Sequence, residues 1–150
     1  MMFMRIMFAA LLSAATVTAA DHQELYAALK VRAATAKSND QDKIYAQLAL
    51  HGTEVANDQY TAGDVAKAQG TIDEVVSYAE KARDAALGSN KNLKQTEIIL
   101  RQASRRLEEV RRSLAVEDRS YLETAINRVE NVRKELLDQM FGPKKTREKK

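Results

Sequence analysis

Three polar side chains that could bind a metal ion lie close together in the first half of the chain. His51, Glu54 and Asp58 are three and four residues apart, so on a helix they would lie on neighbouring turns of one face. Imidazole and carboxylate groups are ligands for divalent cations such as Zn²⁺. The alternative is that His51, which lies between Leu48 and Val55, is a histidine at the edge of an apolar core.

The second histidine, His22, could bind copper if a leader peptide were removed at one particular bond. Cleavage after Ala19 would leave a chain that begins Ala20-Asp21-His22, in which the free amine, two amides and the imidazole can hold Cu(II) in a square plane. Cleavage after Ala20 would abolish this arrangement. The alternative is a histidine without a role near a frayed terminus.

The sequence offers little for covalent catalysis. There is no cysteine, neither histidine has the context of a catalytic triad, and no glycine-rich phosphate loop is present. We therefore expect a protein that is not an enzyme and has no cofactor.

Residues 1–20 are typical of a secretory signal peptide. Arg5 provides a positive start, an apolar run follows over Ile6–Val17, and Val17-Thr18-Ala19 or Thr18-Ala19-Ala20 offers a small-residue cleavage site. The apolar run is too short for a permanent membrane anchor. We therefore expect the mature protein to begin near residue 21, in the periplasm or outside the cell, without a transmembrane anchor. Without cysteine it would have to be stabilised by packing alone.

The rest of the chain has the pattern of a helical protein. Apolar residues recur three and four apart nearly everywhere after Asp21, which predicts an all-α, up-and-down antiparallel bundle of four to five helices with coiled-coil-like seams over residues 21–142. Turn and capping residues separate the expected helices. The expected helices are 21–37, about 41–60, 64–87, a fourth from residue 93, and a fifth that follows the turn at 116–118 and ends near 140.

Each expected helix has a set of residues predicted to face inward. In chain order they are Leu25, Leu29 and Ala33 or Ala36; Ile44, Leu48, His51 and Val55; Val65, Ala68, Ile72, Val75, Ala79, Ala82 and Ala86; Leu93, Thr96, Leu100, Ala103, Leu107, Val110 and Leu114; and Leu122, Ala125, Val129, Val132 and Leu136.

The charges divide the expected bundle into two halves. Residues 21–90 hold 7 basic and 11 acidic side chains, a net charge of −4, whereas residues 91–142 hold 11 and 9, a net charge of +2. Halves of opposite sign can dock on each other, so the basic half does not require a nucleic-acid partner, and export makes one unexpected.

A group of five arginines lies in the basic half, interleaved with glutamates. Glu97 and Arg101, Arg105 and Glu109, and Glu108 and Arg112 are four residues apart, a spacing that predicts solvated ion pairs along one helix. The alternative is a polyanion-binding patch. The arginines are Arg101, Arg105, Arg106, Arg111 and Arg112.

Residues 143–150 form a basic tail after the helix stop at Gly142-Pro143. We expect this tail to lack structure, either as a solubilising segment or as a weak, salt-sensitive contact with an anionic surface. Its basic residues are Lys144, Lys145, Arg147, Lys149 and Lys150.

One short stretch resembles a known repeat family. The residues from Gly63 to Ala68, with Ala56 before them, resemble the turn and second-helix start of a tetratricopeptide repeat. This resemblance implies a peptide-binding groove. The chain after residue 20 is also similar to small exported helical bacterial proteins of unassigned function, which implies the architecture and no chemistry.

Together these patterns predict a non-catalytic structural or protein-interaction bundle of the cell envelope, with an unidentified envelope protein as its partner. One alternative is a carrier of a small ligand or metal in the bundle interior, which would require converging polar groups there. The other is a chaperone-like peptide-binding module, which would require an uncovered apolar stripe on the first two helices.

Overall fold

The computed structural model describes residues 18–142, and over this range the chain is helical and without strands. The all-α bundle expected from the sequence is therefore confirmed. The expected signal segment over residues 1–17 and the basic tail 143–150 lie outside the described residues. The helices are α1 Ala19–Thr35, α2 Gln41–Thr61, α3 Val65–Ser89, α4 Leu93–Ser113, the 3₁₀ turn η1 Val116–Asp118 and α5 Arg119–Phe141.

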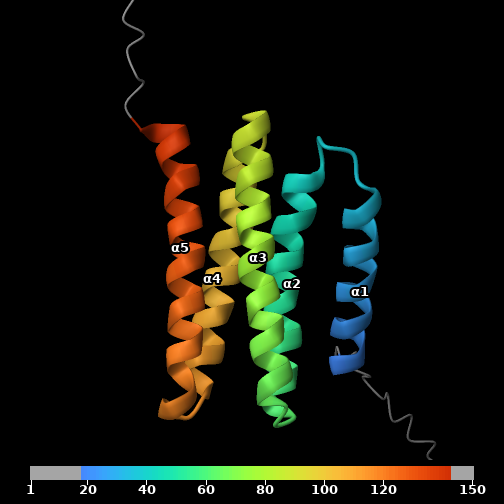
Figure 1. Ribbon diagram of the computed structural model, residues 1–150, viewed down its shortest axis with the longest axis vertical. Coiled ribbons are helices and arrows are strands. Elements are labelled where there is room, and N and C mark those ends of the chain that lie inside the picture. The colour runs from blue at the N-terminus through green and yellow to red at the C-terminus, as the bar shows by residue number, and fades with distance from the viewer. Residues whose placement is uncertain (1–17, 143–150) are drawn as a thin grey trace, which may run out of the picture.

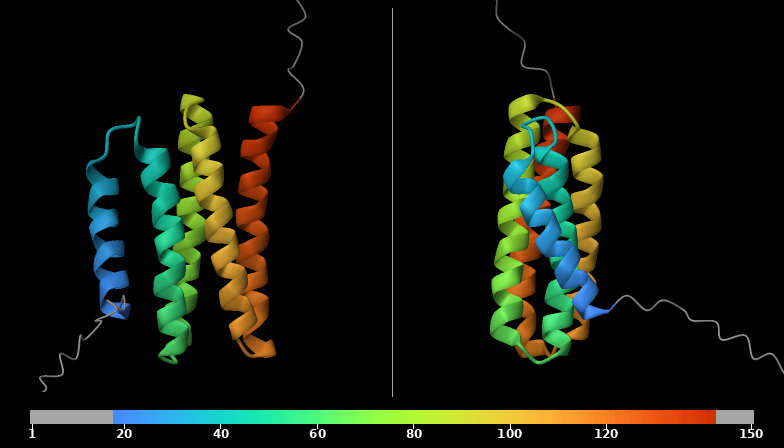
Figure 2. Two further views of the ribbon diagram at one scale, coloured as in Figure 1. Left: turned by 180° about the vertical axis from the view of Figure 1, so that it is seen from behind. Right: turned by 90° about the vertical axis from the view of Figure 1, so that its right-hand side faces the viewer.

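Helices α2 to α5 form a four-helix bundle in which the chain direction alternates (Figure 1). The hairpin α2–α3 packs on the hairpin α4–α5, so that α2 lies beside α4 and α3 beside α5. Helices α3 and α4 therefore stand at opposite corners, and the link between them crosses the end of the bundle (Figure 2, right). Asn90 and Asn92 in this link have φ values of 54° and 55°, a left-handed conformation that asparagine tolerates better than most residues.

The bundle core is built almost wholly from aliphatic side chains. The inward faces predicted for α4 and α5 are confirmed, since Leu100, Ala103, Leu107 and the whole predicted set of α5 are buried. Helices α2 and α3 contribute many alanines, which let helix axes approach closely. The buried cluster is Ala46, Ala49, Ala56, Ile72, Val75, Val76, Ala79, Ala82, Ala86, Leu100, Leu107, Val110, Leu122, Ala125, Val129, Val132 and Leu136.

Helix α1 packs outside this bundle, against α2 (Figure 1). A second apolar cluster joins them, made of Tyr26, Leu29, Ile44, Leu48 and Val55. The stripe predicted for α2 therefore faces mainly α1, whereas the bundle interior receives the alanines of α2. The cluster of α2–α5 is complete without α1.

Gly52 lies where α1 and α3 both come close to α2. A Cβ atom at this position of α2 would lie 2.7 Å from Cγ2 of Val75 in α3 and 3.3 Å from Oη of Tyr26 in α1. Since real Cβ atoms almost never come that close to a neighbour, the absence of a side chain here lets α1 and α3 close on α2.

Two residues predicted to face inward are exposed, Leu25 at 45% and Val65 at 36%. His51, Leu93 and Leu114, also predicted to face inward, are only partly buried. Tyr26 takes the inward position in α1, because its ring fills the space beside Gly52 while its hydroxyl reaches α3. Val65 is the first residue of α3, directly after the turn at Gly63 and Asp64.

The helix starts differ in whether a side chain caps them. Asp40 and Asp118 occupy N-cap positions, but neither side chain makes a capping hydrogen bond. A capping box is present instead at α1, where Thr18 Oγ1 accepts from the Asp21 amide and Asp21 Oδ2 accepts from the Thr18 amide. Gly63 has φ +82°, as its turn requires. Within residues 18–142, no helix combines the length and apolar character needed to cross a membrane.

Candidate functional site

Both histidines of the chain line one surface cleft between α1, α2 and α4. The cleft has a volume of about 640 Å³ and lies on one flank of the α1–α2 contact. Its walls combine two imidazoles, a carboxylate, an amide, a guanidinium and two aliphatic side chains, and no lining residue has a hydroxyl or thiol nucleophile. The lining residues are His22, Leu25, Leu50, His51, Glu54, Gln102 and Arg106.

His22 of α1 forms a hydrogen bond with Asp58 of α2. Its Nδ1 lies 2.6 Å from Oδ2 of Asp58, and both side chains are mostly buried. Because an ionised carboxylate only accepts hydrogen bonds, Nδ1 donates in this contact. Asp58 is therefore engaged by α1 and is not free to join His51 in a metal site.

His51 occupies the middle of the cleft wall on α2. Burial lowers its pKa, the nearby Glu54 raises the pKa in part, and His22 lowers it slightly. The imidazole is therefore neutral at neutral pH, with one nitrogen that donates a hydrogen bond and one that accepts.

Glu54 is held by the opposite wall. Its Oε1 lies 3.2 Å from Nε of Arg106 in α4, which also bonds Glu109 within its own helix. Within residues 18–142, no group of three or more His, Asp or Glu side chains is placed to hold a metal ion. Of the three residues expected to bind a metal, Asp58 is thus paired with His22 of α1 and Glu54 with Arg106 of α4.

On its other side, α1 makes a second set of polar contacts, with α3. Tyr26 Oη donates to Glu74 Oε2 at 2.7 Å, and Lys30 Nζ lies 3.0 Å from the same oxygen. Burial raises the pKa of Tyr26, and the hydrogen bond to Glu74 raises it further. Tyr26 also meets Tyr78 edge-on, with ring centroids 6.4 Å apart. Helix α1 is therefore fixed by one acidic residue on α2 and one on α3.

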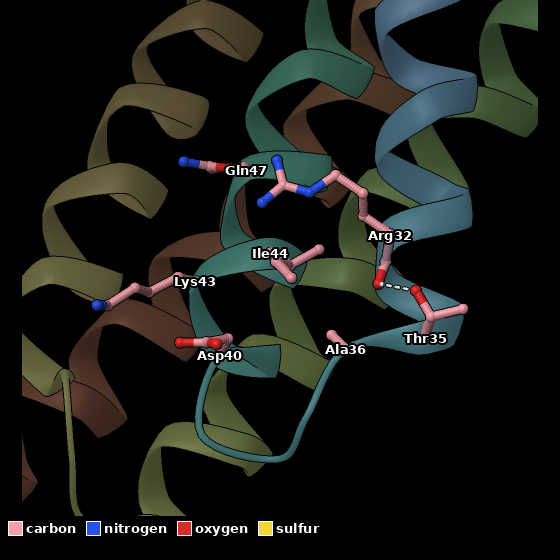
Figure 3. Close-up of a pocket in the computed structure, with 7 residues that line it drawn as sticks. All are labelled: Arg32, Thr35, Ala36, Asp40, Lys43, Ile44 and Gln47. Atoms are coloured by element: carbon pink, nitrogen blue, oxygen red, sulfur yellow. Dashed lines mark hydrogen bonds between the residues drawn. The ribbon is translucent and has the colours of Figure 1, made fainter.

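A second hollow, of about 450 Å³, lies near the loop that joins α1 to α2 (Figure 3). Arg32 extends from α1 toward Gln47 of α2 across its opening, and Lys43 and Asp40 line its rim. The one side-chain hydrogen bond marked among the drawn residues is local, from Thr35 Oγ1 to the Arg32 carbonyl. This hollow has no grouping of side chains with evident chemistry.

The buried polar network of the protein lies elsewhere, between α4 and α5. Glu97 is only 2% exposed, and its carboxylate receives Arg101 at 2.5 Å and Arg133 at 2.8 Å. Arg133 also bonds Glu130, which in turn accepts from Ser104. Burial raises the pKa of Glu97, but the hydrogen bonds from the two arginines outweigh burial, so the net pKa lies below the usual value.

The sequence anticipated this region only in part. The expected pairs Glu97–Arg101 and Glu108–Arg112 are present, at 2.5 and 3.3 Å. The expected pair of Arg105 with Glu109 is replaced by one between Arg106 and Glu109, three residues apart. The burial of Glu97 was missed, because its partner Arg133 is distant in sequence. A glutamate directly beside the apolar seam was the available signal.

Comparison with known proteins yields no relationship for this chain. Neither a protein-family model, nor a curated protein, nor a solved structure matches it.

Proposed function

We propose that this protein is a non-catalytic, exported interaction module of the cell envelope, with the cleft between α1, α2 and α4 as the surface that meets a protein partner. The observation that carries the proposal is that the polar side chains suited to chemistry are engaged in joining helices. His22 binds Asp58 and Glu54 binds Arg106. The cleft therefore suits recognition through hydrogen bonds and apolar contact rather than bond making.

The packing of the bundle interior favours an interaction module over a carrier of a small ligand or metal. The core of α2–α5 is mainly aliphatic, and the buried polar side chains Thr53, Thr71 and Thr96 come from three different helices, whereas a carrier would need polar groups that converge on an interior space. The buried polar network of Glu97 lies between α4 and α5, and its carboxylate is already paired with Arg101 and Arg133.

The cleft offers a partner a varied surface. Leu25 and Leu50 provide apolar contact, and the neutral imidazole of His51 can donate and accept hydrogen bonds. Gln102 is exposed on the α4 wall. A partner side chain that enters the cleft can thus exchange water for both kinds of contact.

Site-specific photocrosslinking in living cells tests this surface. A benzophenone amino acid would replace Gln102 in the cleft or, as the control, Asn127, which is exposed on α5. We expect a discrete crosslinked species from position 102 and none from position 127. Equal crosslinking at both positions, or none at 102, would refute the cleft as the partner surface.

The proposed export has a separate test. The intact mass of the protein recovered from the envelope fraction should correspond to a chain that starts at residue 20 or 21, because the expected cleavage sites end at Ala19 and Ala20. A mass that still includes residues 1–17 would refute removal of the leader.

A further inference from the structure

Helix α1 has an outer face that no other described element covers. Viewed from the α1 side, this helix lies in front of the bundle (Figure 2, right). At 100° per residue, seven exposed positions lie within about 60° of Ala28, directly opposite Tyr26 and Lys30. These positions are Asp21, Glu24, Leu25, Ala28, Val31, Arg32 and Thr35.

This face carries two exposed aliphatic side chains on either side of the small side chain of Ala28. Leu25, which also lines the edge of the cleft, is 45% exposed, and Val31 is 67% exposed. The outward positions of α5, by contrast, carry charged and polar side chains throughout the body of the helix. Those positions are Glu123, Thr124, Asn127, Arg128, Asn131, Lys134, Glu135 and Asp138.

The two charges nearest Ala28 have no ion-pair partner in the described part of the chain. The salt bridges of α1 there use His22 and Lys30, which leaves Glu24 and Arg32 unpaired. Arg32 leans toward Gln47 (Figure 3) but remains exposed, so rotation about its side-chain bonds can redirect it.

The outer face is complementary to itself. Glu24 and Arg32 are each four residues from Ala28, about 6 Å along the axis, and Leu25 and Val31 are each three residues away. If two copies of α1 packed antiparallel about a two-fold axis at Ala28, each Glu24 would lie level with the partner's Arg32. Each Leu25 would likewise lie level with the partner's Val31. A parallel pair would instead place like charges level.

We infer that the outer face of α1 is the contact between two copies of this chain, which pair antiparallel through a two-fold axis at Ala28. Two-fold contacts between identical chains are self-complementary in this way. The small side chain of Ala28 lets the two helices approach closely, and Leu25 and Val31 remove apolar surface from water. The inference does not depend on export or on an envelope partner.

The contact is expected to be weak. Helix α1 has 17 residues, and one pair of helices of this length buries less than the roughly 1,200 Å² of a standard interface. The full chain should therefore be mainly monomeric at about 1 μM and increasingly dimeric toward about 1 mM, as sedimentation equilibrium would measure.

Charge reversal tests both the surface and its register. Glu24→Lys places lysine level with the partner's Arg32, and Arg32→Glu places two glutamates level, so each variant alone should weaken dimerisation by about tenfold or more. A mixture of the two variants restores both opposite-charge pairs and should form a heterodimer, which native mass spectrometry would detect. The double variant in one chain should dimerise as the original does.

Controls away from α1 make the result decisive. Glu117→Lys, in the exposed turn η1, changes the net charge as Glu24→Lys does and should leave dimerisation unchanged. Ala28→Glu should abolish the dimer, whereas Ala66→Glu at an exposed position of α3 should not. Circular dichroism of each variant checks that it is folded. Monomers at all concentrations, or a dimer indifferent to Ala28→Glu, would overturn the inference, as would binding of this face to lipid vesicles in place of a second copy.

Discussion

Removal of Arg133 tests whether the buried charges between α4 and α5 hold these helices together. Arg133 is 16% exposed and contacts Glu97, which is 2% exposed. Loss of one partner from a buried ion pair typically costs about 3–5 kcal/mol, because the other charge stays buried without compensation. Arg101 would still contact Glu97 at 2.5 Å. We therefore expect Arg133→Met to lower the free energy of unfolding by about 2–3 kcal/mol.

A second arginine of the same helix provides the matched control. Arg128 pairs with Glu80 at 2.6 Å, but their side chains are 56% and 33% exposed. Ion pairs of this kind contribute about 0–1 kcal/mol, so Arg128→Met should change stability within that range. Urea unfolding followed by circular dichroism would measure both. If Arg133→Met cost no more than Arg128→Met, the buried network would not be a source of stability.

The original protein and the Arg133→Met variant should differ in how their stability responds to pH. The arginines hold the pKa of Glu97 below its usual value of 4.5, so ionised Glu97 contributes stability above about pH 4.5 that is lost as the pH falls through its lower, folded-state pKa. In Arg133→Met this contribution is smaller. The stability difference between the two proteins should therefore shrink from about pH 7 to about pH 3. A constant difference would show that lost packing, not charge, explains the variant.

Three further changes probe other parts of the molecule. Leu107→Ala, at a position that is 0% exposed, should cost about 2–5 kcal/mol in urea melts, whereas the neighbouring variant Glu108→Ala should have a much smaller effect. Gly52→Ala should destabilise by about 1–3 kcal/mol because its Cβ has no room, while Gly70→Ala, with nothing within 4 Å, should be neutral or stabilising in thermal melts. Deletion of residues 143–150 should abolish any salt-sensitive binding to anionic vesicles, and unchanged binding would show that the tail is not responsible.

Periodicity predicted the second hairpin of the bundle well, for a clear physical reason. The apolar residues of α5, from Leu122 to Leu136, follow one regular seam with charged residues on both sides. Such a pattern fits only one orientation of the helix, so the buried face could be read directly. In α4, Leu100 and Leu107 are fully buried for the same reason.

The face of α2 was harder to predict, because this helix is packed on two sides. Ile44, Leu48 and Val55 form the conspicuous stripe, yet they meet α1. Ala46 and Ala49 face the bundle. Alanine carries a weak periodic signal, although its small size is what allows the close packing of α2 with α3.

The candidate cleft could not have been assembled from the sequence. The spacing of His51, Glu54 and Asp58 correctly placed three polar residues on successive turns of one helix. The partner of Asp58 is His22, 36 residues earlier, and the partner of Glu54 is Arg106 in α4. Which residue each carboxylate meets depends on how the helices are arranged around α2, and short-range spacing contains no information about that arrangement.

Helix α1 shows how a failed periodicity can still be informative. Its predicted inward residue Leu25 is exposed, whereas Tyr26 and Leu29 are buried, because apolar side chains occupy both sides of this helix. A helix that packs on its neighbours along one side only needs only one apolar face. The second apolar face of α1, with Val31 exposed and Glu24 and Arg32 spaced evenly about Ala28, is therefore unexplained by contacts within the described part of the chain. The proposed contact between two copies of α1 accounts for this second apolar face. The same contact accounts for the weak apolar periodicity of α1, which made this helix the hardest to orient from the sequence.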